Sequence, residues 1–480
     1  MGLSGKESAA KFAWLYLFVL VGLVFLVTRL FLFKDSVLPY RFDGGVYVRY
    51  IKDFASNLMY LFPGVDRPGS IEGEFVGLYI LTSVLYRIKI PIEIIIAGVG
   101  IGFQALSFFI IYKLQSKEWN KFFALALVLL LSFSFVQFNT FSYAFLKAIV
   151  AITFGLATIF FIKKKSLWVA GIFVFLMSLT HIATALFFLP LILVEGLQKF
   201  NKKTVKAFLI GITVFCVGFL FFNYTAVLDK VWGIRFFTTN WVEQGMFVGL
   251  EKYCFLLFLA IPFAILGISS RLKSKKIDFI AIGFVIGLIL NILPITLRTR
   301  FITYFDLFFW ICVVQGFYVF YTASVGVRAE NILEQESVKK FNKVLALIVF
   351  SVVILGVVQL NEIFKNRPVI YNSEIRSIKG FAASSNKEAY ILTPSNRYAS
   401  YVYGYSDRRT ISPGLFENDP WSKEQWKNFI SERDESKIGR YLSELKKPLY
   451  VYIGDNDNSG FYRDFGIFDF FSHNILYYGK

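Results

Sequence analysis

The segment from Val76 to Tyr86, with the sequence VGLYILTSVLY, decides how this chain is threaded through a membrane. It is apolar, but it is short and is closed by Arg87 and Lys89. A helix needs about 20 apolar residues to cross a bilayer. We therefore interpret the segment as an amphipathic helix that lies flat at the membrane surface. Much longer apolar runs flank it, at residues 13–33 and 92–112.

The composition indicates a multi-pass protein of the cell membrane. Of the 480 residues, 56% are hydrophobic and 57 are phenylalanine, and a water-soluble domain of that composition would expose large apolar patches. The net charge of +18 does not indicate a nucleic-acid partner, because most Lys and Arg residues stand in short clusters between apolar runs, as cytoplasmic anchoring charges do. Cys216, Cys254 and Cys312 lie inside apolar runs and lack the spacing of metal ligands.

The positions of the basic clusters choose between two topologies. If residues 76–86 crossed the membrane, the lysines at 163–165 would lie outside the cell. If the segment lies flat, every basic cluster lies inside. The flat arrangement also requires residues 167–197 to form a hairpin of two short spans with its tip near Thr180 and His181, and that run is too long for one span. The basic clusters are Lys6/Lys11, Lys113/Lys117/Lys121, Lys163–Lys165, Lys199/Lys202/Lys203, Arg271/Lys273/Lys275/Lys276 and Arg328/Lys339/Lys340/Lys343.

The flat arrangement predicts about eleven transmembrane helices, with a cytoplasmic N-terminus and an extracytoplasmic C-terminus. A transmembrane domain is expected over residues 1–365, with a first outer loop at 34–91 that contains interfacial helices. The expected spans are residues 13–33, 92–112, 122–138, 146–162, 166–179, 182–197, 205–226, 252–268, 277–295, 301–321 and 344–364.

A small extracytoplasmic α/β domain is expected at residues 366–480, where the long apolar runs end. Strand-like runs occur at Ala389–Leu392, Tyr398–Tyr405 and Leu449–Ile453. Charged helical stretches, Lys423–Ser431 and Glu435–Lys446, lie between them.

One carboxylate stands directly past the first span, in Arg41-Phe42-Asp43-Gly44-Gly45-Val46-Tyr47-Val48-Arg49-Tyr50. Two interpretations fit Asp43: a general base or metal ligand at the lipid–water boundary, or an ordinary helix N-cap. The glycines after it allow the backbone to approach a ligand closely or to turn sharply.

Three further features fall on the predicted outer face. His181 is either functional, as ionisable residues inside membranes usually are, or a hydrogen-bonded residue at a helix end. Arg298 and Arg300 stand where the positive-inside rule disfavours cations. Two guanidinium groups suit a phosphate, and lipid-headgroup anchoring is the alternative. Asp306, deeper in the next span, is expected to form an internal salt bridge with Arg300.

Two predicted outer loops complete this face. Asn139–Tyr143 is short and polar. Val231–Phe237 combines aromatic residues with Arg235, and we assign Arg235 to a bound lipid phosphate or a sugar ring. An aromatic belt at the membrane interface explains the same residues.

This arrangement, with the motif Phe42-Asp43-x-x-x-Tyr47-x-Arg49 in the first outer loop, resembles the membrane glycosyltransferases of the GT-C fold. The motif is similar to the start of that loop in oligosaccharyltransferase catalytic subunits. The resemblance implies that Asp43 is the catalytic acidic residue and that Arg298 or Arg300 holds the phosphate of a polyprenyl-linked donor. It also places Tyr47 and Arg49 next to the catalytic position.

Two departures separate the chain from the oligosaccharyltransferases. Their peptide-binding motif of paired Trp, Asp, Tyr and Gly is absent, and Asn139–Phe145 holds no carboxylate where a second acidic motif is expected. We therefore do not expect protein N-glycosylation or the metal site of that branch.

The expected function is transfer of a sugar from a polyprenyl-phosphate-linked donor to a glycan, lipid or protein acceptor at the extracytoplasmic face. Asp43 takes the acceptor's proton, and Arg298, Arg300 and Arg235 bind the lipid phosphate. His181, Tyr47 and Arg49 orient the substrates. No residue is assigned to a metal, and no cofactor is assigned, although a divalent cation stays open. Two alternatives remain: a transporter or flippase of lipid-linked sugars, and a non-enzymatic envelope assembly protein.

Overall fold

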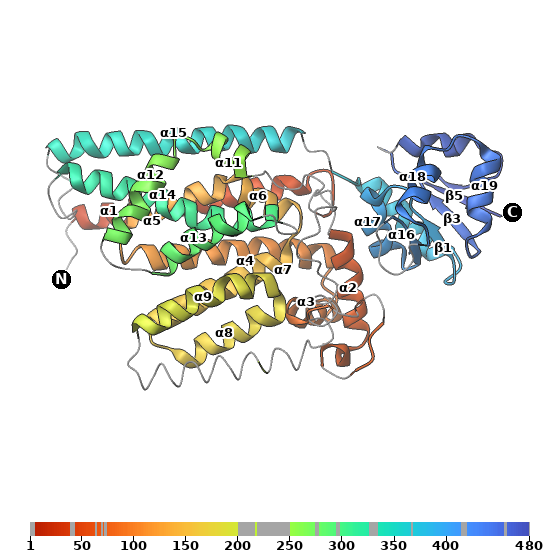
Figure 1. Ribbon diagram of the computed structural model, residues 1–480, viewed down its shortest axis with the longest axis horizontal. Helices are drawn as coiled ribbons and strands as arrows, with labels where there is room; N and C mark the ends of the chain where they lie inside the picture. The colour runs from red at the N-terminus through yellow and green to blue at the C-terminus, as the bar shows by residue number, and fades with distance from the viewer. Residues whose placement is uncertain are drawn as a thin grey trace.

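A computed structural model describes most of the chain: residues 5–38, 44–62, 65–68, 71, 74–199, 217, 250–273, 278–293, 298–325, 335–365, 368–413, 420–455 and 458–479. It consists of a bundle of long helices with a small α/β domain at one end (Figure 1). Helix α1 begins at the opposite end of the bundle from this domain. The last helix of the bundle, α15 (Gln335–Lys365), leads into the domain.

The bundle is built from apolar helices of uneven length. They are α1 (Gly5–Leu30), α4 (Ile92–Gln115), α5 (Lys121–Phe133), α6 (Phe135–Ser142), α7 (Leu146–Lys163), α8 (Leu167–Thr180), α9 (Ile182–Lys199), α11 (Leu250–Leu256), α12 (Ile261–Lys273), α13 (Phe279–Ile292), α14 (Ile302–Val325) and α15. By length and composition, the described residues hold 4 helices able to cross a membrane, or up to 6 if each of two bent pairs is one span. The total of about eleven stays a prediction, since the expected span 205–226 lies outside the described residues except for Val217.

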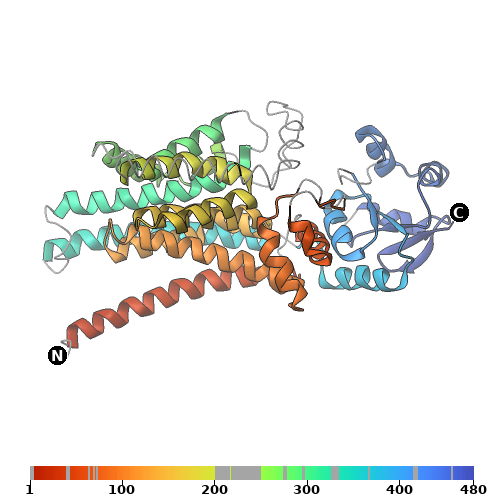
Figure 2. The ribbon, with the colours of Figure 1, turned by 90° about the horizontal axis from the view of Figure 1, so that it is seen from below.

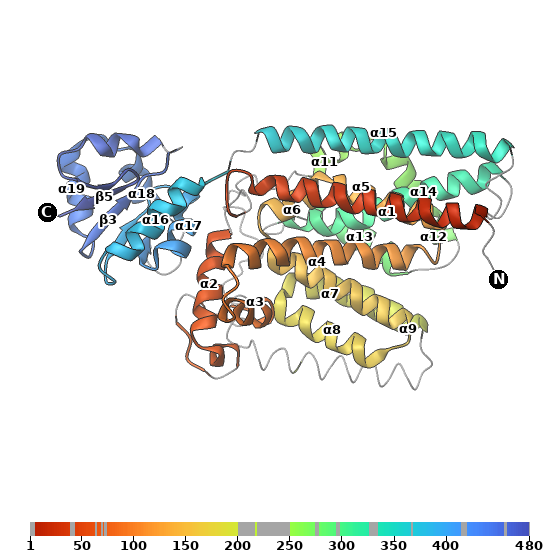
Figure 3. The same ribbon diagram turned by 180° about the vertical axis from the view of Figure 1, so that it is seen from behind.

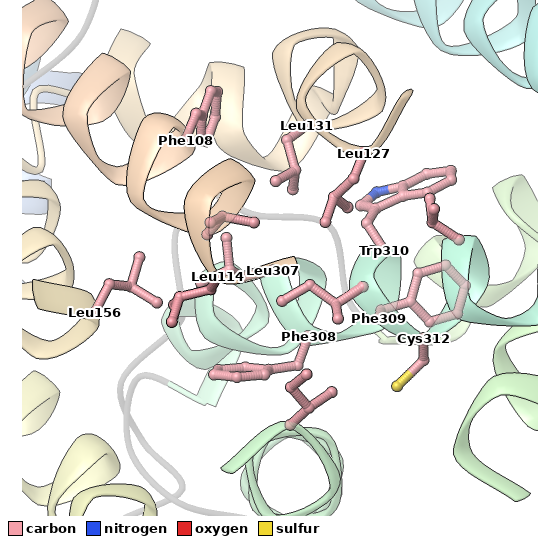
Figure 4. Close-up of a cluster of buried hydrophobic side chains, with 14 of the residues drawn as sticks. Phe108, Leu114, Leu127, Leu131, Leu156, Leu307, Phe308, Phe309, Trp310 and Cys312 are labelled. Carbon is pink, nitrogen blue, oxygen red and sulfur yellow. The ribbon is translucent and has the colours of Figure 1, made fainter. Parts of the chain in front are cut away.

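Helix α14 lies at the centre of the bundle, and every side chain from Ile302 to Val314 is buried. Figure 4 shows this core between α14 and the helices around it. Labelled there are Leu307, Phe308, Phe309, Trp310 and Cys312 of α14 with Phe108, Leu114, Leu127, Leu131 and Leu156. Burial of this apolar surface against protein fixes the helices around α14.

Two expectations for the bundle have different outcomes. Residues 167–197 do form two helices, α8 and α9, with the break at His181, so the hairpin is confirmed. The polar outer loop expected at Asn139–Tyr143 is wrong, because residues up to Ser142 form the buried helix α6. Helix α6 continues α5 after a 51° bend. At that bend the Ser134 hydroxyl accepts a hydrogen bond from the backbone N–H of Gln137 (3.3 Å), which starts the new helix.

Residues 34–91, predicted as the first outer loop, supply two helices that run across the end of the bundle. They are α2 (Gly44–Ser56) and α3 (Gly77–Arg87), and both lie across the direction of the long helices (Figures 1 and 2). The rings of Phe54 and Tyr79 stack between them at 4.6 Å. The segment at 76–86 therefore lies across the ends of neighbouring helices, as the flat interpretation expected. Short 3₁₀ turns follow α1 (η1, Phe31–Phe33) and α2 (η2, Leu58–Leu61).

The C-terminal domain is a five-stranded mixed sheet with helices on both faces. The strand order is β2-β1-β3-β5-β4, with β1 parallel to β2 and β3, and β5 antiparallel to β3 and β4. Ile391 stands opposite Thr410 on one side and Tyr450 on the other. The elements are α16 (Asn372–Ser384), β1 (Tyr390–Leu392), α17 (Asn396–Ser406), β2 (Arg409–Ile411), α18 (Lys423–Ser431), α19 (Glu435–Ser443), β3 (Leu449–Tyr452), η5 (Asn458–Asp464), β4 (Asp469–Ser472) and β5 (Ile475–Tyr478).

Alternating residues of the strands face different cores. Ile391 packs with α16 and α17, whereas Tyr390 and Leu392 pack with α18 and α19. The first of these cores continues into α2, α3 and the start of α4, so the domain and the outer loop share one apolar interior. Figure 3 shows α16 and α17 on the side of the domain that faces α2.

The strand expected at Tyr398–Tyr405 is wrong, because these residues lie in helix α17. The alternation of Tyr401, Tyr403 and Tyr405 imitates a strand. In the structure every residue from Tyr398 to Ser406 is buried, since α17 lies between the sheet and α2. Burial on all sides removes the helical periodicity that would have identified it.

Candidate active site

The predicted catalytic acid, Asp43, lies outside the described residues. The described element that follows it in the sequence is α2, which begins at Gly44. The contacts of α2 are therefore the described contacts nearest to Asp43 along the chain.

Gly45 lies against the C-terminal domain. A Cβ atom added to Gly45 would overlap the carbonyl oxygen of Ser400, and one added to Gly404 would overlap the carbonyl oxygen of Gly45. The close approach that the sequence suggested for a ligand is made here by the backbone of α17. The α2–α17 contact thus explains Gly45 on packing grounds.

Arg49 and Tyr47 are both engaged by protein groups. Tyr47 is 7% exposed in the shared apolar core. The guanidinium of Arg49 pairs with Asp53 (2.8 Å) and Asp407 (3.8 Å) and lies over the ring of Tyr403 at 5.5 Å. Partial burial opposes the charge of Arg49, but Asp53, Tyr403 and Asp407 outweigh it and raise the pKa. Arg49 therefore links α2 to the C-terminal domain, and its role in orienting substrate stays a prediction.

His181 ends α8 and its ring caps α9. The ring Nδ1 accepts a hydrogen bond from the backbone N–H of Thr184 (3.3 Å) and lies 2.8 Å from the Thr184 hydroxyl. That hydroxyl lies 2.7 Å from the hydroxyl of Tyr304 in α14. Because a backbone N–H donates to Nδ1, we place the ring proton on Nε2. His181 is therefore a hydrogen-bonded residue at a helix end, and its role toward substrate stays a prediction.

The predicted phosphate-binding arginines lie at the start of α14. Arg298 and Arg300 belong to the 3₁₀ turn η4 (Arg298–Phe301). The side chain of Arg300 is exposed, and its guanidinium lies 5.1 Å from the centre of the Phe145 ring. Arg300 precedes Tyr304 by one helical turn, so it stands close to the Tyr304–Thr184–His181 chain of hydroxyl and ring groups. Arg235, the third predicted phosphate ligand, lies outside the described residues.

An ion pair near Phe145 in the sequence connects α7 to residues 34–91. Lys147, two residues after Phe145, pairs with Glu74. Its ammonium group lies 5.9 Å from the ring of Tyr50 in α2 and 5.3 Å from that of Tyr79 in α3. Arg300 therefore contacts Phe145, and Lys147, two residues further along the chain, contacts α2 and α3. The structure brings Arg300, His181 and the start of α2 to the same end of the bundle.

The expected salt bridge between Asp306 and Arg300 is wrong. Asp306 is fully buried and accepts four hydrogen bonds from neutral groups: the Ser134 hydroxyl (2.8 Å), Gln137 Nε2 (2.9 Å), the Tyr253 hydroxyl (2.8 Å) and Trp310 Nε1 (3.0 Å). These donors satisfy the carboxylate where α5 bends into α6. Asp306 therefore stabilises the bent span.

Arg29 is a buried residue that sequence reasoning missed. Its Nε donates to Gln104 Oε1 (3.0 Å), and Gln104 Nε2 donates to the carbonyl of Gln137 (2.8 Å). Gln137 in turn donates to Asp306, so two amides connect a buried cation to a buried anion. An arginine inside the first predicted span was the signal available in the sequence.

Glu74 and Lys147 were also missed as a pair. Lys147 is a lone lysine at the outer end of a predicted span, where the positive-inside rule disfavours cations, and that was its signal. No sequence pattern joins it to Glu74. Among the described residues, no group of three or more His, Cys, Asp or Glu side chains is placed to hold a metal ion, and Asp43 falls outside that set.

Comparison with known proteins identifies the family of the chain and similar folds. A sequence model of the EpsG family matches residues 19–326. Among solved structures, ArnT from Cupriavidus metallidurans in the apo state is similar with a TM-score of 0.59 and 11% identity, covering 98% of each chain. ArnT bound to undecaprenyl phosphate is similar with a TM-score of 0.55 and 10% identity, covering 97% of this chain and 98% of that one. No curated protein has a matching sequence. The predicted GT-C fold is thereby confirmed.

Proposed function

Because this chain belongs to the EpsG family, we propose that it is a glycosyltransferase that uses a polyprenyl-phosphate-linked sugar as donor. The observation that supports this function most is that two described elements lie at the same end of the bundle. They are the start of α2, which directly follows Asp43 in the sequence, and η4, which contains Arg300. An acid and a guanidinium at the lipid–water boundary suit a donor whose sugar is in water and whose chain is in the membrane. ArnT, which shares the fold, has been solved with undecaprenyl phosphate.

In the proposed reaction, an acceptor hydroxyl oxygen attacks the anomeric carbon of the donor. The bond from that carbon to the phosphate oxygen breaks, and the phosphate keeps the electron pair. Asp43 takes the proton of the acceptor hydroxyl. Arg298 and Arg300 stabilise the negative charge that develops on the phosphate. His181, Tyr47 and Arg235 keep their predicted supporting roles, with the acceptor a glycan, a lipid or a protein.

The carboxylate is tested by Asp43→Asn. General-base catalysis contributes about 10²–10⁴-fold, so we expect sugar transfer in membranes to fall by at least about 100-fold. Binding of undecaprenyl phosphate to the purified protein should stay unchanged, because the arginines are intact. Transfer at the wild-type rate would remove Asp43 from the mechanism.

The arginine is tested by Arg300→Ala, with undecaprenyl phosphate as the probe. Loss of one charged hydrogen bond costs about 1.5–3 kcal/mol, so we expect the Kd to rise about 10-fold or more. Arg433→Ala is the matched control, because Arg433 also lies over a phenyl ring, 3.6 Å from the centre of Phe461, but in the C-terminal domain. An equal Kd in both variants would contradict phosphate binding by Arg300.

A further inference from the structure

The helix that follows Asp43 is held from outside the bundle as well as from inside. One side of α2 packs on α3 and α4, and another side packs on α17. Gly45 and Gly404 lie at the crossing of α2 and α17, and neither has room for a Cβ atom against the other helix. We call this contact the outer crossing. Because backbone meets backbone there, α2 cannot shift toward α17 and α17 cannot turn without a clash.

Charged groups fix the direction in which α17 crosses α2. The Lys52 ammonium donates to the carbonyl of Gly404 (3.0 Å) and pairs with the Asp407 carboxylate (2.9 Å). Asp407 has a φ of 50° and follows the last residue of α17, so the turn there carries its carboxylate toward α2. Arg49 approaches the same carboxylate at 3.8 Å. The pairs prevent rotation about the glycine contact.

The apolar groups next to the crossing belong to one core. Val48 and Ile51 of α2 and Tyr401 and Tyr405 of α17 are all buried in the same cluster. The hydroxyl of Tyr405 also donates to Glu93 at the start of α4 (3.1 Å). The C-terminal domain is therefore part of the support of α2 on the side away from the membrane helices.

We propose that the C-terminal domain positions the catalytic acid through this outer crossing, with Gly404 and Lys52 as positioning residues. The inference rests on the proposed role of Asp43. Asp43 directly precedes α2 in the sequence, so we expect a displacement of α2 to displace it as well. A misplacement of about 1 Å can lower a rate about 100-fold, and an added methyl group at Gly404 requires a shift of that size.

The first test is Gly404→Ala, with Gly380→Ala and Gly439→Ala as matched controls in the same domain. Added Cβ atoms at these two helical glycines have nothing within 4 Å. We expect Gly404→Ala to lower kcat at least about tenfold with the Kd for undecaprenyl phosphate within about twofold of the wild type. Both controls should keep the wild-type kcat. A protein that is merely less stable would lose active fraction and lipid binding together, and that result would overturn the proposal.

The second test keeps the glycines and exchanges the charges. Lys52→Glu places two carboxylates together and should lower kcat, whereas Lys52→Glu combined with Asp407→Lys restores the pair and should recover most of it. Failure of the double variant to recover activity while it folds normally would overturn the proposal.

A third measurement does not depend on the role of Asp43. A protease site inserted after Lys365 cuts the chain between bundle and domain. We expect the cut domain to stay bound to the wild-type bundle and to be released by Gly404→Leu. Release from the wild-type protein, or release by Gly404→Leu with full kcat retained, would overturn the proposal. An active Asp43→Asn protein whose cut domain still binds would instead overturn the proposed function.

Discussion

Within the described residues, two pairs of helices cross backbone to backbone through paired glycines, and the surroundings of these crossings differ. The outer crossing joins α2 and α17. The inner crossing joins α12 and α14, where a Cβ atom added to Gly267 would overlap the carbonyl of Cys312 and one added to Gly316 would overlap the carbonyl of Phe263. Small residues let membrane helices approach closely, because packing replaces the hydrophobic driving force there.

Aromatic rings and a buried arginine lie beside the inner crossing, whereas partly exposed ion pairs lie beside the outer one. Phe263 lies 4.6 Å from Phe317 beside the inner contact. Lys52, Arg49 and Asp407 surround the outer contact. Beside the inner contact the guanidinium of Arg271, one turn after Gly267, donates to Gln315 of α14 (3.2 Å) and pairs with the buried Asp278. Beside the outer contact the ion pairs are partly exposed to water. Because salt screens exposed charges more than buried ones, the outer crossing should respond more strongly to added salt than the inner one.

The largest effect is expected from Gly316→Leu in the inner crossing. A leucine side chain has no space against Phe263, and overpacking a core costs about 1–3 kcal/mol or more. We expect little folded protein after detergent extraction, measured by size-exclusion chromatography. Gly98→Leu, at a membrane-helix glycine with nothing within 4 Å of an added Cβ, should be extracted normally. Normal folding of Gly316→Leu would show that the inner contact is not tight.

A smaller effect is expected from Lys52→Met in the outer crossing. Partly exposed ion pairs are worth about 0.2–1 kcal/mol, so the cut domain should stay bound but dissociate more readily. In the wild type, added salt should weaken the docking through screening, and in Lys52→Met this salt dependence should shrink. Dissociation constants of the cut domain at two salt concentrations measure both. If the salt dependence of docking were the same in Lys52→Met as in the wild type, charges other than Lys52 would be responsible for it.

The smallest effect is expected from Glu374→Gln, in the core that the domain shares with α2. Burial raises the pKa of Glu374 above its ordinary 4.5, and hydrogen bonds from Tyr371, Asp455 and Tyr452 only partly offset this. A carboxyl whose pKa is higher in the folded state stabilises the fold below its unfolded pKa, and this contribution is lost as pH rises through the folded pKa.

The difference in domain Tm between wild type and Glu374→Gln should therefore shift in favour of the variant as pH rises above about 4.5. Thermal unfolding followed at several pH values gives that difference. A difference independent of pH would show that Glu374 does not titrate in this range.

Local patterns predicted several elements correctly. Helix α18 has the bounds Lys423–Ser431 expected from the sequence, because Ser422 and Gln425 form a capping box. The break at His181 followed from span length. The strand expected at Tyr398–Tyr405 failed because two packing partners hid the helical period. The partner expected for Asp306 failed because three of its four donors, Ser134, Gln137 and Tyr253, are distant in sequence.

The site is only partly readable from the sequence. Unusual placement of Asp43 and of the η4 arginines in the charge pattern marked them as candidates, and their roles remain predictions. The partners of α2 could not be found that way, since Lys52 and Gly404 are 352 positions apart. No local rule connects a glycine after a membrane span with one in a distant helix.

The separation of α2 from α17 along the chain has a consequence for biosynthesis. Ribosomes add about 5–20 residues per second, so α2 leaves the ribosome about 20–70 s before α17 does. During that time α2 has been synthesised but its packing partner α17 has not. If the outer crossing positions α2 as proposed, a polypeptide that ends before α17 would carry the described bundle helices without that support. The proposed sugar transfer is then expected only after the last hundred or so residues have been made.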